Sequence, residues 1–225
     1  MTDLPTSLNG KTIAVLGGTG PQGRGLAGRF AAAGLRVVIG SRSAERAATT
    51  ATALRDAVGG DLTGSDNVGA AEAGDIVVIA VPWDGHGELL KELAPSLRGK
   101  VVVDCVNPLG FDKQGAYVLH VEEGSAAQQA QSILTESTVV GAFHNVSAVT
   151  LEDPEVASVD TDVLVVGDVR EATDVIQELA ATIPGVRGVY GGRLRNARQV
   201  EALTANLISV NRRYKAHAGI RVTDI

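Results

Sequence analysis

Four glycines fall within residues 17–23, GGTGPQG, and their spacing suits the binding of a phosphate group. The residues of this loop that match the pattern G-x-G-x-x-G are Gly18, Thr19, Gly20, Pro21, Gln22 and Gly23. In such a loop the first glycine permits a tight turn, the second lets the backbone approach a pyrophosphate, and the third lets the next helix pack close to the preceding strand. The amino end of that helix then offers free N–H groups and a partial positive charge to the phosphates. The loop predicts a dinucleotide site; the alternative is an ordinary glycine-rich turn.

The end of the next β-branched run, VVIGSRS, indicates which dinucleotide is bound. A site for NAD normally carries Asp or Glu here, to bond the ribose 2′-hydroxyl. This chain instead has Ser41 and Arg42, with Arg46 one helical turn later, and Thr19 offers a further hydroxyl. A carboxylate would repel a 2′-phosphate, whereas hydroxyl and guanidinium groups attract it through charge-assisted hydrogen bonds. NADP is therefore the expected cofactor; a solvated basic loop is the alternative.

Further candidates lie at the carboxyl ends of other predicted strands, where open α/β sheets bind their ligands. Trp83, the only tryptophan, is expected to form a wall for the nicotinamide or the second substrate; a core or lid residue is the alternative. Asn107 follows the next strand. His144 is expected to face the nicotinamide site, although a structural, hydrogen-bonded histidine is equally compatible with its position.

The remaining titratable residues carry weaker signals. His86, at the start of a predicted helix, is expected to be exposed. Cys105 is expected to be a buried strand thiol, although a nucleophilic pair with His144 is conceivable. Asp75 and Asp104 border strands, where turn or capping roles are expected.

No familiar pattern of catalytic residues or metal ligands stands out in the chain. HExxH, GxSxG and paired carboxylates are missing, and a single cysteine excludes an internal disulfide and a cysteine-based zinc site, so no metal is expected. Hydride transfer between two bound ring systems depends on positioning and on exclusion of water more than on acid or base groups. An apolar platform at the strand ends suits that chemistry.

The elements that must position these residues alternate between β-branched runs and alanine-rich helices. The predicted strands cover residues 11–18, 35–40, 74–82, 100–108, 138–148, 161–168 and 186–192. The predicted helices cover residues 21–34, 44–58, 85–97, 125–137, 171–183 and 195–214. Continuous Val/Ile runs suit strands that are buried on both faces of a parallel sheet. This order predicts an α/β, Rossmann-like doubly wound parallel sheet in residues 1–148 and a smaller C-terminal α/β domain in residues 149–225.

Composition limits the possible partners. The net charge of −6 and the 3% aromatic content argue against nucleic acid and anionic membranes as partners. The start, MTDLPTSLNGK, lacks the basic and apolar segments of a secretory signal, and no apolar run approaches the length of a membrane span. A cytoplasmic protein that binds small molecules is expected.

Five blocks between about residues 11 and 210 resemble the NADPH-dependent coenzyme F420 reductases. These blocks are TIAVLGGTGPQGRGLAGRFAAAG, VVIGSRS, DIVVIAVPW, FHNVSA and LRNARQVEALT. The resemblance implies direct hydride exchange between NADP(H) and coenzyme F420, an 8-hydroxy-5-deazaflavin, in a homodimer. It also implies that the region after residue 148 contributes to the deazaflavin site and to the dimer contacts.

The resemblance also implies roles for single residues. Thr19, Gly20, Pro21 and Gln22 correspond to the pyrophosphate loop, and Ser41, Arg42 and Arg46 to contacts with the 2′-phosphate, the last replacing a lysine of the relative compared. Trp83, Asn107 and Ala148 match positions that line the cofactor. Asn107 stands where that relative has an aliphatic residue, so only its backbone position carries over. His144 and Val146 match the side that faces the deazaflavin.

Three alternative functions remain open at this point. Another small NADPH-dependent reductase, of the imine or pyrroline-carboxylate type, would usually need a longer, all-helical second domain. A non-catalytic NADPH sensor would bind the nucleotide without turning it over. A ferric reductase module would be joined to membrane helices, which the chain lacks.

Overall fold

The computed structural model describes residues 4–225; residues 1–3, part of the N-terminal segment considered above, lie outside the described residues. Eight strands form one sheet: β1 (Thr12–Leu16), β2 (Arg36–Ser41), β3 (Asp61–Asp66), β4 (Ile76–Ile79), β5 (Val101–Asp104), β8 (Thr138–Gly141), β9 (Thr161–Gly167) and β10 (Val186–Gly192). Their order is β10-β9-β8-β5-β4-β1-β2-β3, and every neighbouring pair is parallel except β8 and β9. A separate hairpin consists of β6 (Leu109–Asp112) and β7 (Gly115–Val118).

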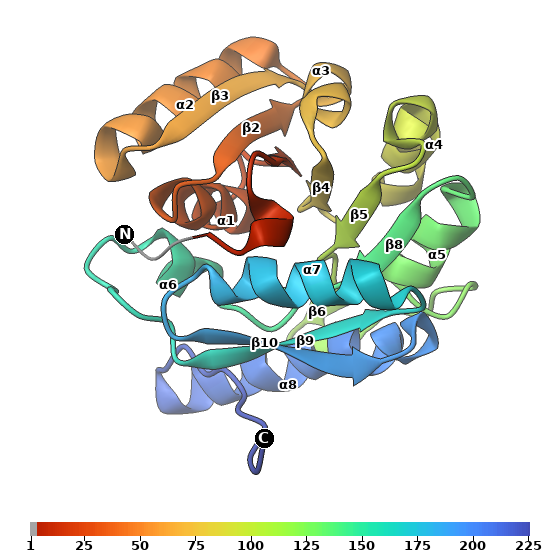
Figure 1. Ribbon diagram of the computed structural model, residues 1–225. Coiled ribbons are helices and arrows are strands. Elements are labelled where there is room, and N and C mark those ends of the chain that lie inside the picture. The colour runs from red at the N-terminus through yellow and green to blue at the C-terminus, as the bar shows by residue number, and fades with distance from the viewer. Residues whose placement is uncertain (1–3) are drawn as a thin grey trace.

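Helices cover both faces of this sheet (Figure 1). They are α1 (Pro21–Ala32), α2 (Ala44–Val58), α3 (Asn67–Ala73), α4 (His86–Leu97), α5 (Ala126–Ile133), α6 (Ala148–Glu152), α7 (Arg170–Ala181) and α8 (Ala197–Tyr214), with short 3-10 turns at Thr6–Leu8 and Leu194–Asn196. Side chains on alternate strand positions enter two separate cores. Ile13 and Val15 of β1 pack with α1, α2 and α7, whereas Ala14 and Leu16 pack with α3, α4, α5 and α8. This double covering confirms the predicted α/β, Rossmann-like class.

The structure contains elements that were not predicted from the sequence, among them β3, α3, α6 and the β6–β7 hairpin. Several predicted strands were too long, and those expected over residues 74–82 and 100–108 end at Ile79 and Asp104. β3, with the sequence DLTGSD, is a polar edge strand, α3 has only seven residues, and the β6–β7 hairpin follows a region expected to end with a strand. The strand predicted over residues 138–148 ends at Gly141. The chain then turns sharply at Phe143, whose φ is 64°. A residue with a positive φ cannot continue an extended strand, so the strand ends here although the neighbouring residues are apolar.

Residues after position 148 continue the same sheet. β9 pairs with β8 in antiparallel orientation, and β10 adds to the edge of β9. α8 then packs across the second core, beside α5. The division of the chain at residue 148 stays a prediction, but the two parts share one sheet.

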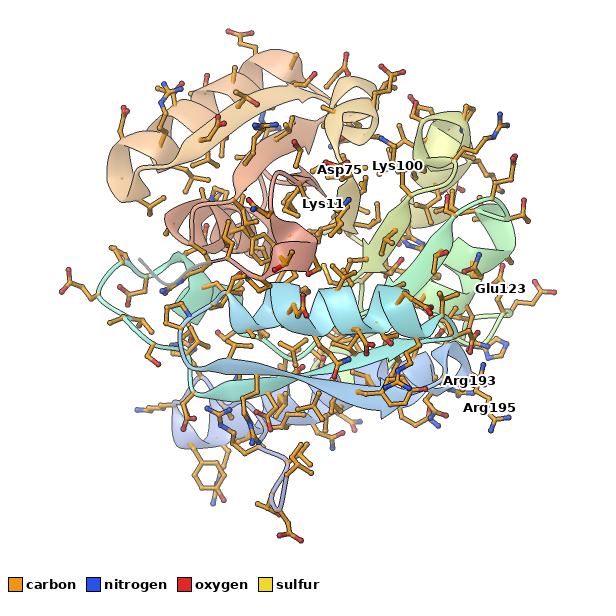
Figure 2. The ribbon with its side chains drawn as sticks, viewed as in Figure 1. Lys11, Asp75, Lys100, Glu123, Arg193 and Arg195 are labelled. Carbon is orange, nitrogen blue, oxygen red and sulfur yellow. The ribbon has the colours of Figure 1, made fainter. Side chains whose placement is uncertain are left out.

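The amino-terminal edge of the sheet carries a set of internal polar contacts. Lys11, Asp75 and Lys100 directly precede β1, β4 and β5, and Figure 2 shows them at this edge. A carboxylate oxygen of Asp75 accepts the Thr12 N–H at 2.8 Å. The Lys100 ammonium donates to the carbonyls of residues 71, 72 and 74, at the end of α3, at 2.7–2.8 Å. Asp75 thus joins the starts of β1 and β4, whereas the sequence suggested a turn or capping role.

Candidate functional site

The loop between β1 and α1 is folded by glycines at four positions. Gly17 has φ +75°, so the left-handed turn falls one residue before Gly18, to which the pattern assigned it. A Cβ on Gly18 would lie 2.6 Å from Ile39 Cγ2, and one on Gly23 would lie 2.5 Å from the Gly17 carbonyl oxygen. At Gly20 the nearest atom would be 3.4 Å away. Two of the glycines therefore permit close packing, while Gly20 leaves its outer side open.

A cavity of about 460 Å³ lies beside this loop. The predicted residues that line it are Thr19, Gly20, Pro21, Gln22, Ser41, Arg42 and Arg46. Gly18 and Gly23 are not among the lining residues, because they face Ile39 and the backbone of the loop instead. The structure thus brings the glycine loop and the basic loop after β2 to one cavity.

The arginines of this cavity are held at its rim by the start of α2. Ser43 caps that helix by accepting the Arg46 N–H at 3.3 Å. Ser41 is buried at the end of β2, whereas Arg42 and Arg46 are exposed. Within residues 4–225 neither guanidinium forms an ion pair. Both cations are therefore free to meet an anion in the cavity.

A second cavity, of about 570 Å³, continues along the carboxyl edge of the sheet. The predicted residues that line it are Gln22, Trp83, Asn107, His144, Val146 and Ala148. The two cavities share lining residues in two places. One is the first turn of α1 and the other is the segment after β4, and the shared residues are Gln22, Ala80, Val81, Pro82 and Asp84. Two ligands, one in each cavity, would therefore meet beside β4.

His144 lies at the wall of the larger cavity with its ring shielded from solvent. It is only 3% exposed, and neither ring nitrogen has a hydrogen-bond partner within the described residues. Burial lowers the pKa of His144 to about 4, against the opposing effect of the Asp104 charge. The imidazole is therefore neutral near pH 7. An unpaired buried ring of this kind is available to a ligand.

The backbone of His144 is fixed by residues from distant elements. Its carbonyl accepts hydrogen bonds from Asn107 Nδ2 at 3.1 Å and from Thr204 Oγ1 at 2.8 Å. Gln22 Nε2 donates to the neighbouring carbonyl of Phe143 at 3.2 Å. The Asn107 side chain therefore has a bracing role, although the resemblance carried over only its backbone position.

The part of the wall that α8 and the following segment contribute was not predicted from the sequence. These residues are Thr204, Leu207, Ile208, Asn211 and Ala218. The sequence predicted a helix over residues 195–214, and nothing in it distinguished the positions that border a cavity. Only the packing of α8 against the carboxyl edge assigns them to the site.

Cys105 has the buried thiol that was expected. Its Sγ lies 3.0 Å from the Ile79 carbonyl, to which it donates, and burial raises the pKa of the thiol. A protonated, engaged thiol is a poor nucleophile. Across the described part of the chain, no group of three or more His, Cys, Asp or Glu side chains could hold a metal ion, and no helix is long and apolar enough to cross a membrane.

One prediction about a titratable residue was wrong. His86 is completely buried rather than exposed, and its Nε2 lies 2.7 Å from Asp104 Oδ2. Asp104 also accepts the Val106 N–H at 3.0 Å, which is a turn role, but its other oxygen forms this buried pair. The helix start is buried because α5 and the end of β5 pack beside it, which the local sequence does not show.

Comparison with known proteins assigns this site to a family. The family model described as NADP oxidoreductase, coenzyme F420-dependent, matches residues 12–108. The F420-dependent NADP reductase of Methanothermobacter thermautotrophicus is 42% identical over 95% of both chains, and that of Methanocaldococcus jannaschii is 39% identical over 95% of this chain and 98% of its own. The chain belongs to the F420-dependent NADP reductase family.

The fold of the family agrees with that of this reductase. A crystal structure of a proposed F420-dependent NADP reductase from Arthrobacter sp. FB24 has a TM-score of 0.79 and 25% identity, and the match covers 96% of this chain and all of the other. The resemblance stated from the sequence motifs is thus confirmed. Because the relatives match along almost their whole length, the reductase family accounts for the α8 region as well as for the glycine loop.

Proposed function

We propose that this reductase transfers a hydride reversibly between NADP(H) and the deazaflavin coenzyme F420. NADP(H) would occupy the cavity beside the glycine loop, with its nicotinamide end at the junction near β4, and the deazaflavin would occupy the larger cavity. The observation that carries this proposal is the junction itself, where residues such as Gln22 and Pro82 line both cavities. Two ring systems held there can react directly.

The smaller cavity fits a phosphorylated dinucleotide. The open side of Gly20 lets a pyrophosphate approach the backbone, where a Cβ would otherwise stand in its path. Arg42 and Arg46 supply two unpaired cations, and Ser41 a hydroxyl, at the end of β2. This donor set matches a 2′-phosphate and lacks the carboxylate that would repel it.

The larger cavity fits a planar ring with apolar faces. Trp83, Val146 and Leu207 give it apolar walls, while the buried His144 imidazole and the Cys105 thiol are both neutral near pH 7. Each bound cofactor supplies a carbon that donates or accepts hydride. The chain's own residues hold the rings in place and exclude water, which are the two requirements of hydride transfer.

Isotope transfer tests the function directly. NADPH deuterated on one face of its nicotinamide is expected to label F420 without loss to water, whereas NADPH deuterated on the other face should label none, because a bound nicotinamide presents a single face to its partner. Mass spectrometry of the reduced deazaflavin measures the label. Deuterium in the solvent would contradict direct transfer.

The same mixture distinguishes the alternatives. Tight NADPH binding without any reduction of F420 would favour a sensor, and turnover of a cyclic imine in place of F420 would favour an imine reductase. Family membership supports neither, because the named relatives are F420-dependent reductases.

The pH profile tests the role of His144. Since burial holds its pKa near 4, below the ordinary 6.5, the ring is neutral at and above pH 6 and gains a proton only as the pH falls toward 4. We expect kcat/KM for F420 to show no inflection near pH 6.5 that is lost in the His144→Ala variant. That variant should mainly raise the KM for F420, because the ring positions the deazaflavin and shuttles no required proton. A large fall in kcat with unchanged KM would instead assign catalysis to His144.

A cytoplasmic homodimer belongs to the same proposal. The β6–β7 hairpin exposes Phe111 and Tyr117, and the end of α8 exposes Tyr214, so this side of the protein offers apolar surface that a second copy could cover. Residues 149–225 would contribute Tyr214 to this surface and the α8 wall to the deazaflavin cavity.

A further inference from the structure

His86 lies in a buried polar cluster just behind the larger cavity. Its side chain is fully buried, as is that of Asp104, and the two meet at 2.7 Å. On the other side of the ring, His86 Nδ1 lies 3.1 Å from Gln129 Oε1. The hydride transfer proposed above uses none of these groups. Burying charged groups costs free energy, so their presence here calls for an explanation.

The partners of Gln129 determine the protonation of His86. Gln129 Nε2 donates to both carboxylate oxygens of Glu123, at 3.2 and 3.4 Å, from the loop before α5 (Figure 2). The amide oxygen is therefore the atom that faces His86, and it can only accept. As a carboxylate, Asp104 also accepts, so this arrangement suits an imidazolium, in which both ring nitrogens donate.

The other charged group that faces this pair comes from α8. Glu201 is buried and accepts the N–H groups of Ala126 and Ala127, at the start of α5, at 3.0 and 3.1 Å. Burial raises the pKa of Glu201 to about 7, against the effect of these two hydrogen bonds. Burial alone would lower the pKa of His86, but the hydrogen bond and charge of Asp104, with smaller effects of Gln129 and Glu201, raise it.

The imidazolium contacts one residue of the cavity wall. The rings of His86 and Trp83 have centroids 5.4 Å apart and planes inclined by 32°, a distance at which a cation is attracted to an indole face. The backbone N–H of His86 also donates to the Trp83 carbonyl at 3.0 Å. Gly85, with φ +87°, lies in the turn between them. Ring and backbone of Trp83 are thus both tied to His86.

We propose that His86 is a positioning residue that, as a buried imidazolium held by Asp104 and Gln129, fixes the Trp83 ring as the wall of the larger cavity. The part of this inference that concerns turnover rests on the proposed function. The geometric part does not, because it concerns two side chains of the protein alone.

Trp83 is the only tryptophan, so its fluorescence reports this contact without any ligand. An imidazolium quenches indole emission more strongly than a neutral imidazole does. We expect emission of the wild-type protein to be weak near pH 7 and to rise at higher pH as His86 loses its proton. His86→Gln should be brighter and lack this transition, and Asp104→Asn should shift it to lower pH, because it removes the charge that holds the proton. Trp83→Phe, which has no tryptophan, gives the background emission. His120→Gln, which alters an exposed histidine, is the matched control.

Steady-state kinetics extend the test to function. Loss of the cation–π contact is expected to raise the KM for F420 about three- to thirtyfold in His86→Gln, while the dissociation constant of NADPH stays near the wild-type value. Equal emission and equal pH profiles in folded His86→Gln and wild-type protein would overturn the proposal. If His86→Gln does not fold, the pH shift of Asp104→Asn decides: an unchanged transition overturns the proposal. Wild-type protein that fails to reduce F420 would refute the proposed function, and the fluorescence would still decide the role of His86.

Discussion

Replacement of Arg42 by alanine is expected to weaken the use of NADPH about ten- to a hundredfold, with little effect on NADH. The guanidinium lies at the rim of the smaller cavity without an ion-pair partner in residues 4–225, so a 2′-phosphate is its natural partner there. A charged hydrogen bond contributes about 1.5–3 kcal/mol, which corresponds to this range of affinity. NADH lacks the 2′-phosphate, so the substitution removes no contact with it.

The measurement is kcat/KM for both nucleotides with F420 as acceptor, together with their dissociation constants. Arg55→Ala is the matched control, because Arg55 is an exposed arginine in the last turn of α2, the helix that follows Arg42, and it lines neither cavity. It should leave both nucleotides unaffected. Equal losses with NADPH and NADH in Arg42→Ala would remove Arg42 from the 2′-phosphate site.

Two glycines of α1 are expected to respond to alanine in opposite directions. In Gly23→Ala the new Cβ would lie 2.5 Å from the Gly17 carbonyl oxygen and 2.7 Å from Gly18 Cα. Both are backbone atoms of the loop, so the start of α1 must move away from it. Such overpacking lowers the free energy of unfolding by about 1–3 kcal/mol or more. Because the same shift distorts the loop, NADPH binding should be nearly lost.

Gly28→Ala is the matched control on the same helix. Its Cβ would lie 3.6 Å from Leu54 Cδ2, which is ordinary contact, and alanine is the better helix former. We expect the free energy of unfolding to rise by about 0.5–1 kcal/mol and NADPH binding to stay unchanged. Thermal unfolding and NADPH titration measure both effects. A Gly23→Ala protein that binds NADPH as the wild type does would show that close packing of helix and loop is not needed.

Most of the sheet could be predicted because its signals are local. The apolar runs of β1, β2, β4 and β5 are buried on both faces, so their composition alone distinguishes them from helices. β3 was not predicted because an edge strand has few buried positions. Only one of its residues, Leu62, is buried. The glycine loop and the arginines after β2 could also be predicted, because each lies within a few residues of the element that positions it.

Several features of the site depend on contacts between distant residues. Thr204 lies 60 residues from His144 and Asn107 lies 37 residues from it, yet both bond its carbonyl. The unpaired state of the His144 ring depends equally on what packs around it.

His86 shows most plainly the difference between what the local sequence indicates and what distant contacts decide. Its place at a helix start was evident from the sequence, and exposure was the reasonable expectation for a histidine there. Its burial follows from the packing of α5 and the end of β5 against the start of α4, and its polar partners are Asp104, 18 residues away, and Gln129, 43 residues away. By itself the sequence determined the class of fold, the dinucleotide loop and the basic rim, since periodicity and turn chemistry act between near neighbours. The tertiary structure alone decided which polar groups are paired and which face the cavity, because burial and hydrogen-bond partners arise from residues far apart in the chain.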